Sequence, residues 1–159
     1  MKSLVTGANG FVGSSVVRCL LEAGHEVSCL VRSGSNRNNL RGLSVEIMEG
    51  DLRDTVSLKH AVKNCENLFH VAADYRLWVP DPEIMYDINV KGTKELILAA
   101  FEAGVSRIIY TSSVATLGIS SDGNPANENT PSSLENMIGH YKRSKFLAEQ
   151  VALHLTNKH

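Results

Sequence analysis

A tyrosine and a lysine stand four residues apart near the end of the 159-residue chain, in the segment YKRSK at 141–145. On a helix, Tyr141 and Lys145 would share one face. An ammonium close to a phenol favours the phenolate and lowers the tyrosine pKa from its usual value of about 10 toward neutrality. Such a phenol can donate or accept a proton in a reaction. Taken alone, the pair is more typical of an exposed tyrosine beside a solvated lysine, so other motifs must decide.

A glycine-rich segment stands at the opposite end of the sequence. Residues 6–13 read TGANGFVG, which places Gly7, Gly10 and Gly13 at three-residue intervals. Glycines allow a tight turn and a close approach of the backbone, and the N-terminus of a following helix binds anions such as a pyrophosphate. A strand-to-helix turn often needs glycine for its own sake. Because this cluster follows a short apolar run and precedes a helical pattern, we expect a dinucleotide site here.

Hydroxyl side chains follow the fifth apolar run, in Thr111-Ser112-Ser113. In open α/β sheets, ligands bind at the carboxyl ends of the strands, where these hydroxyls would lie. A serine at that edge can hydrogen-bond a substrate carbonyl or alcohol. A plain capping role at the strand end is equally consistent with the local sequence, because serine is common in turns.

The end of the second apolar run bears on the choice of cofactor. Sites for NAD usually carry an acid there that holds the ribose hydroxyls, whereas an arginine suits the 2′-phosphate of NADP. This sequence has Val31-Arg32, followed by Arg37 and Arg41. Arg32 therefore favours NADP, with NAD as the alternative. The alternative that assigns no function to these arginines is a solvated basic loop.

Metal and disulfide chemistry are not expected. The six histidines show no metal-ligand spacing, and we interpret His70 and His140 as structural. Cys19, Cys29 and Cys65 are odd in number and lie outside any CxxC pair. These features favour reduced, mostly buried thiols in a cytoplasmic protein.

Composition argues against two further classes of partner. Lys and Arg number 16 against 17 Asp and Glu, so no attraction toward nucleic acid or an anionic membrane is expected. No apolar run approaches the ~20 residues of a transmembrane helix. The first residues become glycine-rich too early for a secretory signal. The length fits one domain, residues 1–159.

The elements that must position these residues alternate between strands and helices. Strands are predicted at 2–6, 27–31, 45–48, 68–73 and 107–112, with helices before Gly24, around 58–62, from Asp81-Pro82 to near Gly104, and at about 140–155. Residues 33–41 and 114–139 are predicted loops, and a loop as long as the second usually has a function. The alternation predicts a Rossmann-type, doubly wound parallel α/β sheet of order 3-2-1-4-5. The stripe of Leu96, Ile97, Ala100 and Phe101 is assigned to the core.

Together, these motifs resemble the extended short-chain dehydrogenase/reductase superfamily. Its fingerprint is TGxxGxxG, then a serine after strand five, then YxxxK, and the order and spacing match from Thr6 to Lys145. The segments HVAADYRLW at 70–78 and YTSSVATLG at 110–118 are similar to one branch of it. That branch is the hopanoid-associated sugar epimerases, close relatives of the dihydroflavonol 4-reductases.

The resemblance implies which residues contact the cofactor. These are the pyrophosphate-binding Gly7, Gly10 and Gly13 with the amides of Phe11 and Val12, then Asp51 and Leu52 beside the adenine, and Ala72 and Ala73 along the cofactor. Lys145 would bind the nicotinamide ribose and tune Tyr141, which would be the acid/base.

The resemblance also implies two supporting residues. Ser113 matches the catalytic serine better than Ser112, because Gly118 follows it by five residues, as in the family pattern. Asn89, in the segment NVKGT, matches an asparagine that supports the site.

The implied reaction is hydride transfer between C4 of the nicotinamide and a carbon that bears oxygen, with Tyr141 moving the proton. An NAD(P)-dependent reductase or dehydrogenase is the leading hypothesis, because Val31-Arg32 resembles the corresponding positions of the NADP-using reductases. The alternatives are a nucleotide-sugar epimerase or dehydratase that retains NAD, and a cofactor-binding module without catalysis.

Members of this superfamily are longer and continue into further strands and a substrate-binding domain. We therefore expect that this chain lacks these parts and has little or no catalytic activity by itself. Its fifth strand would then be an open, apolar edge of the sheet. Its small-molecule substrate would be a sugar or another carbonyl or alcohol compound, with 74–80 and 114–139 as the remaining pocket walls. The resemblance further implies a homodimer through the helices near 82–103 and 140–155.

Overall fold

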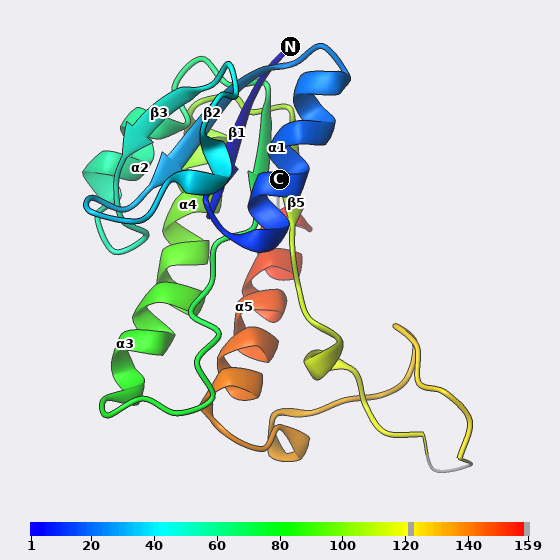
Figure 1. The fold of residues 1–159 in the computed structure, drawn as a ribbon. Helices are drawn as coiled ribbons and strands as arrows, with labels where there is room; N and C mark the ends of the chain where they lie inside the picture. The colour runs from blue at the N-terminus through cyan, green and yellow to red at the C-terminus, as the bar shows by residue number, and fades with distance from the viewer. Residues whose placement is uncertain (121–122, 158–159) are drawn as a thin grey trace.

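The computed structural model describes residues 1–120 and 123–157, which form a parallel sheet covered by helices (Figure 1). Its strands are β1 (Lys2–Thr6), β2 (Glu26–Val31), β3 (Glu46–Glu49), β4 (Asn67–His70) and β5 (Arg107–Tyr110). Their order is β3-β2-β1-β4-β5, and each neighbouring pair is parallel. The predicted fold class and strand order are therefore confirmed.

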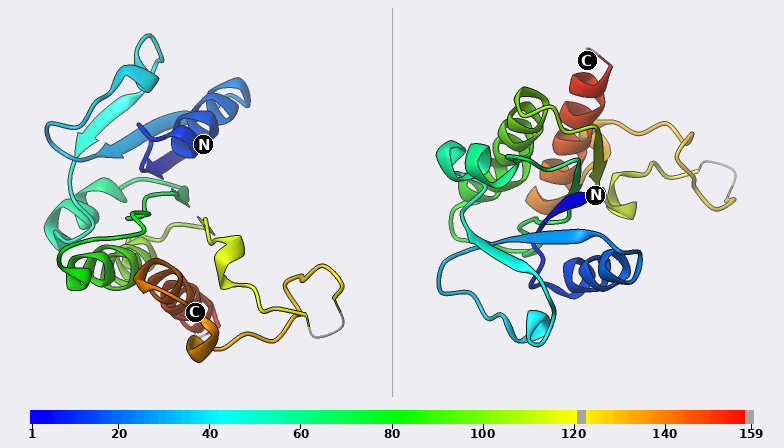
Figure 2. Two further views of the ribbon diagram at one scale, coloured as in Figure 1. Left: turned by 60° about the horizontal axis from the view of Figure 1, so that its bottom comes forward. Right: turned by 90° about the horizontal axis from the view of Figure 1, so that it is seen from above.

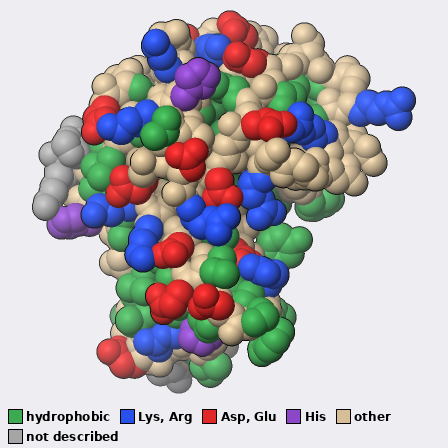
Figure 3. All heavy atoms as spheres, turned by 90° about the vertical axis from the view of Figure 1, so that its left-hand side faces the viewer, with side chains coloured by type: hydrophobic (Ala, Val, Ile, Leu, Met, Phe, Trp, Pro, Cys, Tyr) green, Lys and Arg blue, Asp and Glu red, His purple; other side chains and the backbone are tan. Residues whose placement is uncertain are grey.

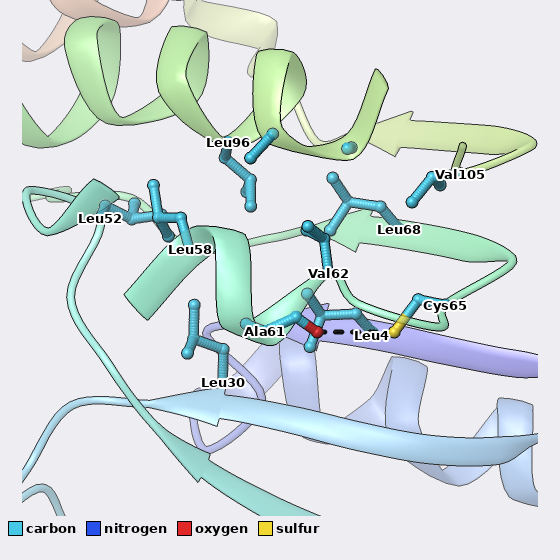
Figure 4. Close-up of a cluster of buried hydrophobic side chains, with 12 residues drawn as sticks. Leu4, Leu30, Leu52, Leu58, Ala61, Val62, Cys65, Leu68, Leu96 and Val105 are labelled. Carbon is cyan, nitrogen blue, oxygen red and sulfur yellow. Dashed lines mark hydrogen bonds between the residues drawn. The ribbon is translucent and has the colours of Figure 1, made fainter. Parts of the chain in front are cut away.

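Successive residues of each buried strand face opposite sides of the sheet and enter two separate cores. Leu4, Leu30 and Leu68 face the core that helices α2 (Thr55–Ala61) and α4 (Gly92–Glu102) cover (Figure 4). Their neighbours Val5 and Cys29 join the second core, against α1 (Phe11–Glu22).

The helices lie in layers on both faces of the sheet. Helix α1 covers one face, whereas α2 and α4 cover the other, and α5 (His140–Thr156) packs beside α4 (Figure 2). In the stripe assigned to the core, Leu96, Ile97 and Ala100 are buried, and Phe101 is partly buried.

Two strands end earlier than the sequence predicts. We expected strands to Ala73 and Ser112, but β4 ends at His70 and β5 at Tyr110. The amides of Val71 and Ala72 leave the ladder because both donate to Thr6 Oγ1, at 3.2 and 3.1 Å. The carbonyl of Thr111 accepts from Lys145 Nζ instead of a strand partner.

The predicted long helix is helical throughout but is not uniform. Asp81 caps it as expected, accepting from the Glu83 amide at 3.0 Å, with Pro82 in the first turn. Helix α3 (Pro82–Tyr86) is followed by a π-helical turn, Asp87–Lys91, before α4 begins. Such π turns are rare and occur often at functional sites.

The described part of the 114–139 segment stands away from the sheet (Figure 2). It contains two 3₁₀ turns, Val114–Thr116 and Leu134–Asn136, and the 33–41 loop contains another at Asn38–Leu40. The two arms of the long segment meet closely, because a Cβ on Gly118 would lie 2.0 Å from the Pro131 carbonyl oxygen.

The surface is mixed in charge. On the face shown in Figure 3, Lys and Arg side chains stand among Asp and Glu side chains.

Cys29 and Cys65 are buried, whereas Cys19 is exposed, and all three are free thiols. In the described ranges, no helix is long and apolar enough to span a membrane. β5 lies at an edge of the sheet, with Ile109 36% exposed.

Candidate functional site

A cleft of about 780 Å³ lies at the carboxyl ends of the strands, where β1 sits between β2 and β4. The strand order reverses there, which is where open α/β sheets bind ligands. Of the predicted site residues, the cleft is lined by Gly7, Gly10, Phe11, Val12, Gly13, Arg32, Asp51, Leu52, Ala72, Ala73, Tyr141 and Lys145. Residues from the two ends of the sequence thus share one cavity.

The glycine turn is required by close packing of the backbone. Gly7 has φ +65°, and a Cβ on it would lie 2.8 Å from Ala72 Cα. A Cβ on Gly13 would lie 2.1 Å from the Gly7 carbonyl oxygen. Gly10 donates its amide to that same oxygen at 2.9 Å. The glycines therefore allow β1, α1 and the loop after β4 to meet without side chains between them.

The N-terminus of α1 is suited to an anion. Gly10 is the N-cap, no side chain caps the helix, and its first turn holds no acidic residue. The first amides of a helix have no partner within it and carry partial positive charge. The amides of Phe11 and Val12, both in the cleft lining, are thus placed to bind phosphate oxygens.

The cleft continues into an outer recess of about 640 Å³ beyond the end of β2. Arg32, Ser33 and Ser35 line this recess, and Arg32 lines the main cleft as well. Opposite them, Arg53 forms two 2.9 Å hydrogen bonds to the Asp51 carboxylate and holds the pKa of that carboxyl below its usual range. Arg37 does not join them, because it pairs with Glu49.

The end of the cleft next to α5 contains Tyr141 and Lys145, both from that helix. Lys145 is 3% exposed, and burial lowers its pKa to about 8. Its Nζ donates to Tyr110 Oη at 2.8 Å and to the Thr111 carbonyl at 2.9 Å. The expected partner Tyr141 lies in the same cleft lining, but the hydrogen bonds of Lys145 go to β5 and the residue after it.

The two candidate serines lie differently. Ser112 lines the cleft and donates to Glu149, a residue of α5 that also accepts from Thr116 Oγ1 at 3.2 Å. Ser113, which we preferred, is not in the cleft lining, and its Oγ accepts from the Ala115 amide at 3.2 Å as the cap of a 3₁₀ turn.

A buried histidine joins β1 to the helical layer. His70 Nδ1 lies 2.8 Å from Thr6 Oγ1, and His70 Nε2 lies 2.9 Å from Thr93 Oγ1. Thr93 donates its proton to the Asn89 carbonyl at 2.6 Å, so it accepts from Nε2–H, and Thr6 donates to Nδ1. Burial lowers the pKa of His70 to about 3, so the ring stays neutral.

Asn89 uses both ends of its amide to support the cleft. It accepts from the Asp74 amide at 2.7 Å and donates to the Asp74 carbonyl at 2.8 Å and to Ser144 Oγ at 2.9 Å. Ser144 in turn donates to the Tyr141 carbonyl at 2.8 Å. The π-helical turn places this side chain, 2% exposed, between the loop after β4 and α5.

No individual role was predicted from the sequence for Thr6, Tyr110, Asp74 or Glu149. The first three lie inside the recognised segments 6–13, 110–118 and 70–78, so their positions were a usable signal. Glu149 carried none, because its partners are distant in sequence. Among the described residues, no group of three or more His, Cys, Asp or Glu side chains could hold a metal ion.

A doubly wound parallel sheet, a glycine turn at a helix N-terminus and a cleft at the strand-order reversal define a dinucleotide-binding α/β protein. The chain matches the model of the NAD dependent epimerase/dehydratase family over residues 3–159, and it belongs to that family.

Similar proteins include both reductases and epimerases by name. A Synechocystis sp. protein named for dihydroflavonol 4-reductase is 48% identical over 149 residues, covering 94% of this chain and 43% of that protein. The crystal structure of gox2253 is 57% identical with a TM-score of 0.92, over 98% of this chain and 47% of that one. The Thermus thermophilus UDP-glucose 4-epimerase complex with NAD is 27% identical with a TM-score of 0.85, over 99% and 51%. The chain therefore spans about half the length of these relatives.

Proposed function

We propose that residues 1–159 are the dinucleotide-binding domain of an NAD(P)H-dependent reductase or dehydrogenase. The observation that carries the proposal is the single cleft that brings the glycine turn, Arg32, Tyr141 and Lys145 together. The cofactor would supply hydride exchange at C4 of its nicotinamide. The protein would supply binding, orientation and proton transfer.

The residues at the carboxyl edge of β1 fit a dinucleotide. Gly13 lets α1 pack directly against the Gly7 carbonyl, and the uncapped first turn of α1 offers donors to the oxygens of a pyrophosphate. Asp51 and Leu52 would flank the adenine, and Ala72 and Ala73 would border the rest of the cofactor. These small side chains leave the cleft open along its length.

We assign NADP as the cofactor, with NAD as the alternative. Arg32 is one of two arginines that line the outer recess, and its guanidinium suits a 2′-phosphate. The Ser35 hydroxyl, in the same lining, donates to the Arg32 carbonyl at 2.6 Å. Asp51, an acid of the same recess, is already paired with Arg53 and so competes less for the Arg32 guanidinium.

Tyr141 is proposed to transfer the proton to or from the substrate oxygen. Lys145 would bind the nicotinamide ribose and stand beside Tyr141 in the cleft. Ser113 remains our candidate for orienting the substrate oxygen, although Ser112 lies in the cleft lining and Ser113 does not. Substitution of each serine by alanine in the full-length protein would decide between them, since loss of the orienting serine should lower kcat.

An epimerase with retained NAD is the second candidate, favoured by the family match and by the NAD complex of the Thermus protein. A reductase consumes free NADPH together with its substrate, whereas an epimerase shows no net change in cofactor absorbance.

The substrate is proposed to be a sugar or another carbonyl or alcohol compound. The whole protein is proposed to be cytoplasmic and to dimerise through α3–α4 and α5, and a monomeric mass in solution would contradict the dimer.

The proposal is tested by titrating the chain with NADPH and NADH, alongside Arg32→Asp. NADPH should bind more tightly to the unmodified chain, and the variant should lose about 10- to 100-fold of that affinity, as expected for hydrogen bonds to a charged group. Its affinity for NADH should not fall, because NADH has no 2′-phosphate and an acid at this position suits the ribose hydroxyls.

Arg41→Asp is the matched control, since Arg41 carries the same charge in the same loop but does not line the outer recess. Equal loss of NADPH affinity in both variants would show only a general charge effect. If neither cofactor binds the folded chain, the proposed function of this domain is wrong.

A further inference from the structure

The Lys145 ammonium occupies an unusual position for a lysine, because it is buried among uncharged acceptors. Its Nζ has three hydrogens, of which Tyr110 Oη and the Thr111 carbonyl accept two. The residue also lines the cleft, so the third hydrogen is left for a group that enters there. The direction of that third hydrogen depends on how firmly the first two are held.

We propose that Tyr110 is the positioning residue for Lys145: its phenol oxygen holds the ammonium at the end of β5 so that one N–H is directed into the cleft. This inference rests on the proposed role of Lys145 in binding the nicotinamide ribose. Tyr110 itself does not line the cleft, so it acts through the lysine and not on a ligand.

The geometry distinguishes a hydrogen bond from simple packing on the ring. Nζ lies 2.8 Å from the phenol oxygen but 4.5 Å from the ring centroid, so the oxygen is the nearer partner. The ring is also in contact with His70, whose centroid lies 5.5 Å away. Because His70 is fixed by Thr6 and Thr93, Tyr110 has a rigid support.

The charges around the lysine make the phenol oxygen important. His70 is neutral, and Tyr110 stays a neutral phenol because burial raises its pKa. Glu149, on the same helix as Lys145, is the nearby carboxylate that raises the lysine pKa, and the phenol of Tyr141 lines the same cleft. Glu149 already accepts from Ser112 and Thr116 and has no hydrogen bond to Nζ. The phenol oxygen is therefore one of the two direct acceptors that stabilise the ammonium against burial.

The test is a pH titration of Lys145, monitored by NMR in chains with ¹⁵N-labelled lysine side chains. The Lys145 signal is the one that is absent from the Lys145→Met spectrum. In Tyr110→Phe, which removes only the oxygen, the Lys145 midpoint should fall by about one pH unit, because the charged form loses an acceptor. Tyr86→Phe is the matched control: Tyr86, on α3, bonds to His140 Nδ1 at 3.1 Å and not to Lys145, so its loss should leave the midpoint unchanged. A midpoint in Tyr110→Phe equal to or above that of the unmodified chain overturns the proposal.

NADPH binding separates this inference from the proposed function. A fall of one unit from about 8 would weaken binding by about eightfold near pH 8.5 and by less than about twofold near pH 6.5, since binding follows the protonated fraction of Lys145. If the midpoint moves but the affinity does not, Tyr110 positions Lys145 and the role of Lys145 toward the cofactor is wrong. If both stay unchanged in a variant with native circular dichroism, Tyr110 only packs against its neighbours.

Discussion

The two ends of the cleft are built by different means. At the end formed by β1 and α1, the site consists of backbone, and its shape depends on glycines within one short segment. At the end formed by β4, β5 and α5, the site consists of side chains from distant segments, such as Asn89 and Ser144, which are 55 positions apart. The comparison shows that a surface made of backbone can be local in sequence, while a network of buried side chains needs the whole fold.

The two ends also respond to change in different ways. The glycine end is sensitive to volume, because a single added carbon would overlap backbone atoms. The side-chain end is sensitive to polarity, because every buried side-chain nitrogen and oxygen in the described residues has a partner. Removing one partner there leaves others unsatisfied, which costs more than the bond itself is worth.

The largest effect is expected from Asn89→Leu, at the side-chain end. It would leave the Asp74 amide, the Asp74 carbonyl and Ser144 without their partner, at about 1–3 kcal/mol each, so the free energy of unfolding should fall by about 4 kcal/mol. Urea denaturation measures this loss. Asn129→Leu, in an exposed loop, is the control and should change stability by less than about 0.5 kcal/mol. A cost below about 1 kcal/mol for Asn89→Leu would mean that the network is not an essential support.

Lys145→Met should stabilise the chain while removing its function. Burial lowers the Lys145 pKa from 10.5 to about 8, so between these values the unfolded chain binds more protons and stability rises with pH. The full penalty, about 3 kcal/mol, applies below about pH 8. Its removal should exceed the cost of leaving the Tyr110 and Thr111 oxygens without a donor, so the variant should be more stable at pH 7 and should lose the rise with pH.

Denaturation curves from pH 7 to 10 for Lys145→Met and the unmodified chain measure both effects. The exposed Lys142→Met serves as control, with the pH dependence expected to be retained. A Lys145→Met variant that is less stable at pH 7 would show that the hydrogen bonds of the ammonium outweigh its burial.

Gly13→Ala probes the glycine end. Its Cβ would force the Gly7 carbonyl to move, so we expect a loss of about 2 kcal/mol in stability together with loss of detectable NADPH binding. Gly104→Ala meets no atom within 4 Å but has φ +75°, so it should cost about 1 kcal/mol and leave binding intact. Normal NADPH affinity in Gly13→Ala would refute the assignment of this turn to the cofactor.

The smallest effect is expected at the rim, from Arg37→Gln. This residue pairs with Glu49 at the surface, and exposed ion pairs contribute about 0–1 kcal/mol. Stability should change by less than about 0.5 kcal/mol, and NADPH affinity by less than about twofold, because Arg37 does not line the recess. A loss as large as that of Arg32→Asp would extend the phosphate site to Arg37.

Most of the fold could be predicted from periodicity and turn residues. Apolar runs located all five strands, and Asp81-Pro82 located the start of a helix, because these signals lie within a few residues. The ends of β4 and β5 could not be predicted, because Thr6 and Lys145 compete there for backbone groups from distant positions. The π-helical turn that places Asn89 was also missed, because the sequence pattern there is that of an ordinary helix.

The sequence by itself determined the glycine turn, the strand order and the placement of Tyr141 and Lys145 on one helix, because each depends on the pattern along the chain. Only the tertiary structure decided which groups Lys145 bonds, which serine faces the cleft and which tautomer His70 adopts. The physical reason is that burial and hydrogen-bond partners are set by contacts between segments. Lys145, which the sequence pattern places next to Tyr141, therefore hydrogen-bonds to Tyr110 in the structure.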